Sequence, residues 1–471
     1  MKKVALLTLV FAMAGCALTP DYKRPSAALA NNPSEVGPIQ SDARLQANLS
    51  YARWWRLYND PALNDLVERS LKSNTDMRVA LANLARASAA VSVVADAELP
   101  QVDVAAETAF SRDSAEQFYL PGPLPNEKVY AALGSVSYEV DLFGRVHRSV
   151  EASQAEMNAT QDAVAATRIA VVAQTVSAYL SVCAAGRESV VTQHAIALQE
   201  EETKLVKRFQ DTGRSGSLAV TRSTAQEDSL RASLPPLSAA KQIALDRLAV
   251  LLGRPRSEVS PSVAACVDEP KITQVIPVGD ARSLIARRPD VAAAEAQLHA
   301  ATAEYGVVKA DLYPSISFGL SGGSIGALSH FNDDDTYKFS IGPLVSWHFP
   351  NRRRANAELT QAQAQIDAAY ARFDARVLIA LDEVQSSLST YGYDLDRMNH
   401  LKTARLSSLK ASTDARKLYE LGRENYLSVL DADRQLASLD QTIATQQTKI
   451  ANDQVQLFLA LGGGWQQENA L

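Results

Sequence analysis

The sequence predicts a mixed α + β membrane protein in which long helices alternate with short strands. Three observations support this fold class. The chain repeats itself once, each half contains two stretches with a period of two residues, and each half contains a long segment with few helix-breaking residues. The two halves are therefore expected to fold alike, with strands placed between helices.

The internal repeat is visible as two constant offsets. A shift of 214 residues aligns Asp76 with Asp290 and Pro100 with Pro314, and a shift of 209 residues aligns Gly213 with Gly422 and Leu252 with Leu461. Scattered matches in an Ala-rich chain would not share an offset. The repeats are predicted over residues 61–253 and 280–464, with a linker over 254–279 and a tail over 465–471.

Each half is predicted to begin with an Ala-rich helix, over 61–97 and over 280–311. Both segments run into a proline, Pro100 in the first half and Pro314 in the second. Proline lacks a backbone N–H and drives the residue before it to extended geometry, so each helix is expected to end there.

Alternating stretches follow each of these helices. They lie around residues 102–110 and 130–140 in the first half, and around 315–320 and 337–349 in the second. One face of each stretch is apolar, and the other is small or polar. Strands of about ten residues with this alternation are typical of transmembrane barrels, although a soluble hairpin shows a similar pattern. The sequence thus predicts four strands per chain.

Two long segments, 145–210 and 354–421, contain few helix breakers. A helix of this length spans about 100 Å, more than the diameter of a globular core, so the helices are expected to run side by side as a coiled bundle. Glycine turns over 212–217 and 421–426 and shorter returning helices follow. Two adjacent prolines, Pro235-Pro236, predict a break in the first returning helix alone.

The N-terminus has the pattern of an exported lipoprotein. A positive start at residues 2–3, a short apolar stretch over 4–13 and two small residues lead directly to Cys16. This predicts a signal peptide over 1–15, a covalent lipid on Cys16, and a lipid anchor with an extended leader over 16–60. An ordinary signal peptide with an incidental cysteine is the alternative.

The composition and motifs indicate no enzyme. The formal net charge is -6 over 471 residues, which gives no basic footprint for nucleic acid. The six histidines are scattered, and Asp333–Asp335 are predicted to lie in a solvated loop. Cys183 and Cys266 lack the spacing of metal or redox motifs, and whether they form a disulfide stays open. We expect no catalytic site, no metal and no cofactor beyond the lipid.

The predicted strands require assembly. Beyond the N-terminus no run of about 18 apolar residues occurs, so a membrane crossing is expected through strands rather than a helix. Four strands cannot close a barrel, for which roughly eight is the minimum, and open edges are not tolerated in lipid. Several chains are therefore expected to share one barrel, and their helices to line one tube.

Several motifs along the chain resemble those of one family, the outer-membrane factors or TolC-like channels, and within it the NodT-type lipoproteins. The motifs are Cys16 followed by Pro20-Asp21-Tyr22-Lys23-Arg24-Pro25, Trp54-Trp55, Tyr138-Glu139-Val140-Asp141-Leu142-Phe143-Gly144-Arg145, Arg287-Arg288-Pro289-Asp290, and Ala460-Leu461-Gly462-Gly463-Gly464-Trp465. The resemblance implies a homotrimer with a twelve-stranded transmembrane barrel and a coiled helical barrel in the periplasm. The chain would lie in the outer membrane of a Gram-negative bacterium.

The same resemblance implies a function and partners. The chain would be the passive, gated exit duct of a tripartite multidrug efflux pump, carrying drugs and other toxic compounds out of the cell. Its partners would be a periplasmic adaptor (membrane fusion protein) and an inner-membrane RND-type transporter. The alternatives are a channel for type I protein or peptide secretion, a channel for metal-ion efflux, and a structural envelope protein or adhesin built on a trimeric coiled coil.

The resemblance also implies a periplasmic gate just after the second glycine turn. Leu427 would be an apolar plug and Asp431 an acidic ring, four residues apart on one helix face, with Arg434 able to pair with an acidic neighbour. A solvated helix-face pair of Asp431 and Arg434 is the alternative. Relatives can hold a second Asp where this chain has Ser428, so the gate's charge stays open. The tips expected to contact the adaptor are Gly213, Arg214, Gly422 and Arg423.

Overall fold

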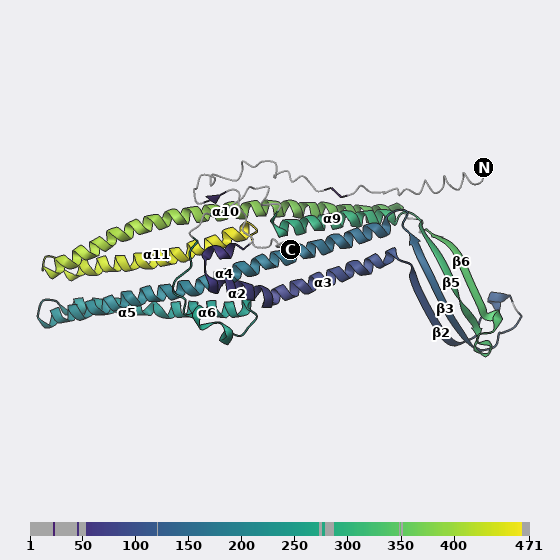
Figure 1. Cartoon of the computed structure of the whole chain (residues 1–471), viewed down its shortest axis with the longest axis horizontal. Coiled ribbons are helices and arrows are strands. Elements are labelled where there is room, and N and C mark those ends of the chain that lie inside the picture. The colour runs from purple at the N-terminus through teal and green to yellow at the C-terminus, as the bar shows by residue number, and fades with distance from the viewer. Residues whose placement is uncertain are drawn as a thin grey trace. The chain divides into compact units, whose positions relative to one another are not determined.

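The two halves of the chain fold into the same series of elements (Figure 1). The computed structural model describes residues 22–23, 45–46, 53–119, 121–272, 276–277, 287–347, 349 and 352–463. The first half contains α2 (Pro61–Ser73), α3 (Thr75–Ala95), β2 (Gln101–Ser111), β3 (Glu127–Val140), α4 (Arg145–Asp211), α5 (Ser217–Ala232) and α6 (Leu234–Leu251). The second half contains α9 (Pro289–Ala310), β5 (Ser315–Ala327), β6 (Tyr337–Ser346), α10 (Arg352–Glu420) and α11 (Tyr426–Ala460).

The helix predicted over 61–97 is two helices in the structure. Asn74 separates α2 from α3, and its side-chain Oδ1 accepts hydrogen bonds from the backbone N–H groups of Asp76 at 2.8 Å and Met77 at 3.1 Å. An asparagine in this position caps the helix that follows it. In the second half, α9 begins at Pro289, and residues 280–286 of the predicted helix lie outside the described ranges.

The returning helices differ between the halves as predicted. In the first half the helix is interrupted at Ser233, and α6 then begins with prolines in its first turn, where no intrahelical N–H is needed. In the second half α11 runs unbroken for 35 residues. Two long helices are also found where the sequence predicted them, α4 with 67 residues and α10 with 69 residues.

The four strands form one antiparallel sheet in the order β2-β3-β5-β6 (Figure 1). The register places apolar residues opposite one another on one face: Val102 beside Val136, Val136 beside Leu320, and Leu320 beside Ile341. The other face carries small and polar residues in matching positions, namely Asp103, Ser135, Ser321 and Ser340. In the part of the chain that the structure describes, the outer edges of β2 and β6 pair with no further strand.

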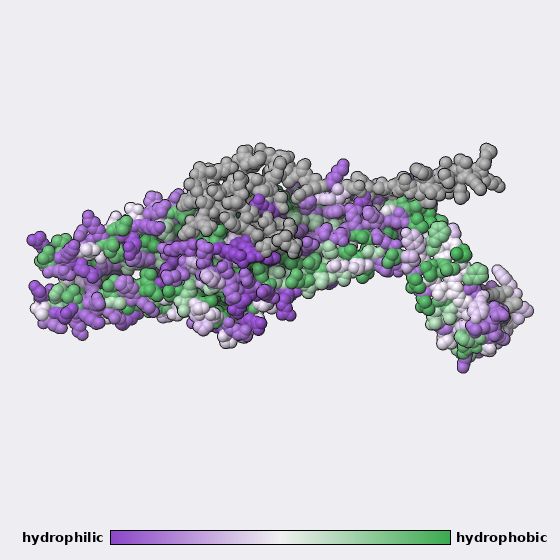
Figure 2. Space-filling model, viewed as in Figure 1, coloured by the Kyte–Doolittle hydropathy of each residue, from purple (hydrophilic) through white to green (hydrophobic). Residues whose placement is uncertain are grey.

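The surface of the sheet changes character along its strands. Figure 2 shows hydrophobic residues over the end of the sheet next to the helices, and hydrophilic residues gathered toward the loops at its far end. Large apolar side chains are exposed on both edge strands, among them Val104 on β2, which is 83% exposed, and Phe339 on β6, also 83% exposed. Exposed apolar patches of this kind mark surfaces that contact a membrane or another protein.

The compact units of the fold do not follow the two repeats. Among the described residues, one unit includes 83–119, 121–161, 293–347 and 352–374, and contains the sheet. The other includes 53–82, 162–272, 287–292 and 375–463. Each repeat contributes to both units, because the boundaries between the units fall within α4 and within α10.

The core of the second unit gathers the N-terminal segment, α4 and α11. Trp54 lies in a buried 3₁₀ turn, Trp54–Tyr58, and stacks on Phe458 of α11 with ring centroids 4.7 Å apart. Asp60 caps α2 and also accepts a hydrogen bond from the Tyr179 hydroxyl of α4 at 2.8 Å. This turn falls in the segment predicted as an extended leader, so the end of that segment belongs to the core.

The repeat seen in the sequence is also present in tertiary contacts. Asn74 Nδ2 donates to the backbone oxygen of Leu251 at 3.0 Å, and Arg288 Nη1 donates to the backbone oxygen of Ala460 at 2.9 Å. These two pairs are equivalent under the two offsets. In both halves, the first helix of the repeat thus holds the end of the returning helix.

Two helices are long and apolar enough, by length and composition alone, to cross a membrane: Thr75–Glu98 and Arg145–Asp211. Most of the apolar window of the second is buried inside the structure, as in the core helix of a soluble protein. None of the window in Thr75–Glu98 is buried.

Candidate functional site

The tips of both helical pairs are glycine turns of the same geometry. Gly213 and Gly422 have φ of 74° and 70°, a region that side chains rarely enter. Arg214 N–H donates to the backbone oxygen of Phe209 at 2.7 Å, and Arg423 N–H donates to that of Leu418 at 2.8 Å. Together with the bonds from Gly213 to Gln210 and from Gly422 to Tyr419, these contacts make a Schellman motif at each tip.

After the second tip, α11 begins with an asparagine cap. Asn425 Oδ1 accepts a hydrogen bond from the backbone N–H of Ser428 at 3.1 Å. This fixes the rotation of the first turn of α11. Tyr426, Val429 and Leu430 are buried against Val206 of α4 in a small hydrophobic cluster.

The predicted gate residues lie on the opposite, exposed face of α11. Leu427 is 42% exposed, and Asp431 and Arg434 are also exposed. The spacing of four and three residues places all three on one side of the helix. Arg434 Nε donates to the Gln226 side-chain oxygen of α5 at 2.8 Å, so within one chain its partner is a neutral amide. The pairing with an acidic neighbour that the sequence allows stays a prediction.

A charged cluster that the sequence did not reveal lies behind this face. Asp433 of α11 pairs with Arg416 of α10 at 2.9 Å and accepts a hydrogen bond from Ser412. Arg416 also lies 3.6 Å from Glu202 of α4. Burial, followed by a hydrogen bond to Asp433, raises the pKa of Glu202 to about 7. The cluster ties α11 to both long helices, directly beneath the exposed residues.

These groups line a cavity of about 780 Å³ between α4, α5, α10 and α11. Its walls carry both charge signs, including Arg405 and Asp440, which form an ion pair across it. Charges in the wall are mostly paired with each other. The described residues contain no group of side chains that could hold a metal ion.

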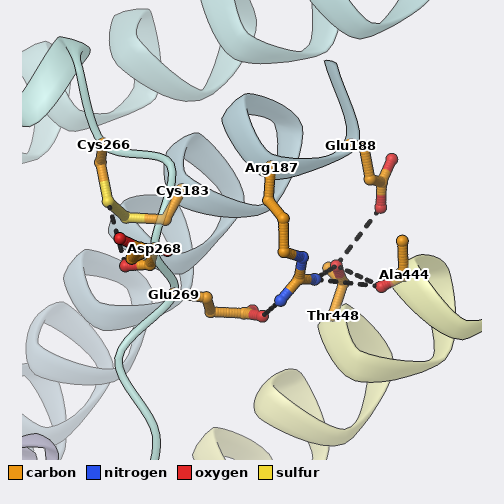
Figure 3. A network of polar contacts seen from close by, with 8 residues as sticks. All are labelled: Cys183, Arg187, Glu188, Cys266, Asp268, Glu269, Ala444 and Thr448. Carbon is orange, nitrogen blue, oxygen red and sulfur yellow. Dashed lines mark hydrogen bonds and ion pairs between the residues drawn. A yellow bond between two sulfur atoms is a disulfide. The ribbon is translucent and has the colours of Figure 1, made fainter. Parts of the chain in front are cut away.

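A second cluster connects the linker between the repeats to α4 and α11 (Figure 3). Cys183 of α4 and Cys266 of the linker form a disulfide, which answers a question that the sequence left open. One turn further along α4, Arg187 pairs with Glu269 of the linker at 2.6 Å. Arg187 also donates to the backbone oxygen of Ala444 and to Thr448 of α11, at 3.1 and 3.3 Å.

Arg288, from the motif Arg287-Arg288-Pro289-Asp290, is a third buried connection. Its guanidinium lies 2.9 Å from Asp290 and 2.6 Å from Glu383 of α10, in addition to its bond to Ala460. The Arg288 guanidinium outweighs burial and lowers the pKa of Asp290 below its ordinary value. This motif is therefore structural, since it joins α9, α10 and the end of α11. The predicted lipidation site, Cys16, lies outside the described residues.

The described chain is built from two tandem repeats, each with a hairpin of the shared sheet between helices. The chain matches the family described as outer membrane efflux protein over residues 66–254 and 281–463, and it belongs to that family. It is thus an outer-membrane component of an efflux system, which confirms the family, the function class and the location that the sequence motifs indicated.

Individual relatives extend along nearly the whole chain. The antibiotic efflux pump outer membrane protein ArpC of Pseudomonas putida is 28% identical over 473 residues, covering 99% of this chain and 96% of that protein. The probable outer membrane lipoprotein SilC of Salmonella typhimurium is 27% identical over 468 residues, covering 98% and 99%. The solved structure of the outer-membrane channel OprN is 31% identical, with a TM-score of 0.87 over 96% of this chain and 100% of that one.

Proposed function

We propose that three copies of this chain form one closed conduit, with a twelve-stranded barrel in the outer membrane and a helical tube in the periplasm. The observation that carries this proposal is the sheet with two open edges and one apolar face. Lipid cannot satisfy unpaired backbone groups, so β6 of one copy would pair with β2 of the next until the ring closes. Each chain contributes four strands, β2, β3, β5 and β6, so three copies would supply the twelve strands of the proposed barrel.

A difference between equivalent helices supports the same assembly. On α9, Ala294, Leu298 and Ala303 are buried, and its His299 contacts Glu151 of α4 at 2.8 Å. On α3, the counterpart of α9 in the first repeat, only Met77 is buried. If the repeat holds throughout the assembly, α3 would pack against the counterpart of α4, namely α10, of a neighbouring copy.

The repeat offsets identify the contact that tests this assembly. His299 and Glu151 correspond to Ala85 and Thr360, both exposed in the single chain. A variant carrying Ala85→Cys and Thr360→Cys should form disulfide-linked trimers under mild oxidation, and each single substitution should remain monomeric on a non-reducing denaturing gel. Cross-links that stop at dimers, or none at all in protein shown to be folded, would contradict this geometry.

Within the conduit, Leu427, Asp431 and Arg434 are proposed to form the periplasmic gate. On a three-fold axis each exposed side chain becomes a ring of three, with Leu427 as a plug and Asp431 as an acidic ring. The support is their shared exposed face at the start of α11, whose rotation the Asn425 cap and the buried residues behind it define.

We further propose two partner proteins and a lipid anchor for this chain. The two Schellman tips, at Gly213-Arg214 and Gly422-Arg423, would meet a periplasmic adaptor, and an inner-membrane RND-type transporter would supply the cargo. Cys16 would carry the lipid, in keeping with the lipoprotein SilC named above. Antibiotics are proposed as cargo because of the relative ArpC; protein secretion and metal-ion export remain the alternatives.

The test is export from living cells together with conductance in vitro. Cells lacking the gene, cells with the wild-type chain and cells with Asp431→Ala would be compared for accumulation of a fluorescent efflux substrate. We expect the wild type to lower accumulation, and Asp431→Ala to raise envelope leakiness and single-channel conductance. Asp414→Ala, which removes an exposed acid from α10, is the matched control and should behave like the wild type. Unchanged accumulation in all strains would contradict drug efflux.

A further inference from the structure

Two pairs of carboxyl groups hold α11 against the long helices. In the first, Arg416 of α10 lies 3.6 Å from Glu202 of α4 and 2.9 Å from Asp433 of α11. In the second, Asp394 of α10 lies 2.8 Å from Lys449 of α11, and the Oδ2 atom of Asp453, one turn further along α11, is buried without a hydrogen-bond partner among the described residues. The side chains of Glu202 and Asp394 are only 9% and 8% exposed.

Each pair has two carboxyl groups and one cation, so the cluster is neutral only when one carboxyl group retains a proton. Two ionised carboxylates in contact repel each other, and burial makes this repulsion costly. The other groups around the first pair carry no positive charge that would compensate its excess negative charge. They are Ser412, Tyr419 and Glu420 from α10, Tyr426 from α11, and Gln199 from α4. The second pair is surrounded by Gln446 and Gln454 of α11 and Tyr391 of α10, with Arg187 and Glu188 of α4 one to two turns away along α11.

The direction of the effect follows from the pKa values. Burial and the neighbouring carboxyl group raise the pKa of Glu202 and of Asp453 to about 7. A raised pKa means that the packed state binds a proton more tightly than a state in which the helix is detached. The stabilisation is therefore complete below the ordinary values of 4.5 and 3.8, and it is lost as pH rises through about 7.

The positions equivalent to these pairs, which would join the returning helix of the first repeat to its neighbours, hold no carboxyl groups. Under the 209-residue shift, Asp433 and Asp453 correspond to Thr224 and Ala244 on α5 and α6. Their partners Glu202 and Asp394 correspond to Ala411 and Ala185. The carboxyl pairs therefore distinguish α11 from its counterpart, and α11 is the returning helix that carries Leu427 and Asp431.

We propose that α11 is a proton-linked helix, whose packing against α4 and α10 tightens when each carboxyl pair holds one proton and loosens when the protons are lost. The pH of the surrounding compartment would thereby set how freely the start of α11 moves. The consequence for permeability rests on the gate proposed above; the helix packing itself does not.

The packing can be measured on the purified full-length protein by pulsed electron paramagnetic resonance. Nitroxide labels at Lys402 of α10 and Ser438 of α11, both exposed, report the distance between the two helices midway between the pairs. From about pH 5 to about pH 8 we expect the detached population to grow, by up to about tenfold per pH unit for each proton released.

Neutral substitutions of similar size test whether the carboxyl pairs cause the pH dependence of the distance between the helices. Glu202→Gln and Asp453→Asn should each remove about half of the slope, and the double variant should be independent of pH. Glu201→Gln and Asp396→Asn, exposed neighbours on the same helices, should keep the wild-type slope. A wild-type distance distribution that does not change with pH, or a response that survives in the double variant, would overturn the proposal.

Conductance in planar bilayers, recorded over the same pH range, separates this inference from the proposed function. If the helix distance responds to pH while conductance does not, the proton linkage stands and the assignment of the gate to α11 fails. If the protein conducts at no pH, the channel function fails while the distance measurement still decides the linkage.

Discussion

Arg288 Nη1 donates a hydrogen bond to the backbone oxygen of Ala460 at 2.9 Å, and thereby holds the C-terminal end of α11 against the start of α9. The same guanidinium forms ion pairs with both Asp290 and Glu383. A cation at the end of a helix satisfies carbonyl groups that have no intrahelical partner. The contact repeats the role of Asn74 in the first half, with a charge in place of an amide.

Arg288→Ala is predicted to destabilise the fold by about 2–3 kcal/mol, because it leaves Asp290 and the Ala460 oxygen without their buried partner. Thermal unfolding followed by circular dichroism would measure the loss. Arg287→Ala, at the less buried neighbour, is the control. Since the pKa of Asp290 lies below its ordinary value of 3.8, its contribution is present above that pH and disappears as pH falls through the lowered pKa. Equal midpoints for wild type and Arg288→Ala at neutral pH would contradict the assignment.

The disulfide between Cys183 and Cys266 closes a loop with a sequence separation of 83 residues. By the loop-entropy relation, Cys183→Ala or Cys266→Ala should lower the free energy of unfolding by about 4.5 kcal/mol, through a less restricted unfolded chain. A reducing agent should lower the unfolding midpoint of the wild type and leave that of the double variant Cys183→Ala/Cys266→Ala unchanged. A wild type that responds no more than this variant would exclude a stabilising bridge.

Arg187 is predicted to stabilise the fold mainly because it pairs with a buried carboxyl group, that of Glu269. The Glu269 side chain is 2% exposed, and burial raises its pKa despite the pairing with Arg187. Arg187→Ala should therefore cost about 3 kcal/mol at pH 8, and less at pH 5, where the unpaired Glu269 can take up a proton. Combining it with Glu269→Gln should recover part of the loss in a double-mutant cycle. Additive losses would show that the two residues do not act as a pair.

At the second tip, a glycine at position 422 is predicted to be required only because of its backbone conformation. Gly422 has φ of 70°, and nothing lies within 4 Å of a Cβ built on it. Gly422→Ala should thus cost about 1 kcal/mol from strain and raise hydrogen exchange at the tip. Gly392→Ala, in the middle of α10 and equally unobstructed, should instead stabilise by about 0.5–1 kcal/mol. Equal effects of the two substitutions would argue against the strain.

Local pattern was enough to predict much of the fold. The repeat, the alternating strands, the two long helices, the glycine tips and the break at Pro235 are encoded in spacing, period and residue type within short windows, and the structure has these elements. Family membership and function class were equally accessible, because the motifs that carry them are contiguous. The break at Asn74 was missed although its signal, a capping residue two and three positions before the N–H groups it binds, was present.

The contacts between distant residues could not be predicted in the same way. Which side of a helix of almost 70 residues faces its neighbour depends on small rotations that accumulate along it, and the sequence states no such angle. Only the tertiary structure therefore joined Cys183 to Cys266, and only it placed Glu202 beside Asp433, 231 positions later in the chain. The sequence by itself determined which elements form and in what order; packing decided which carboxyl groups are buried together, because burial is a property of the assembled helices.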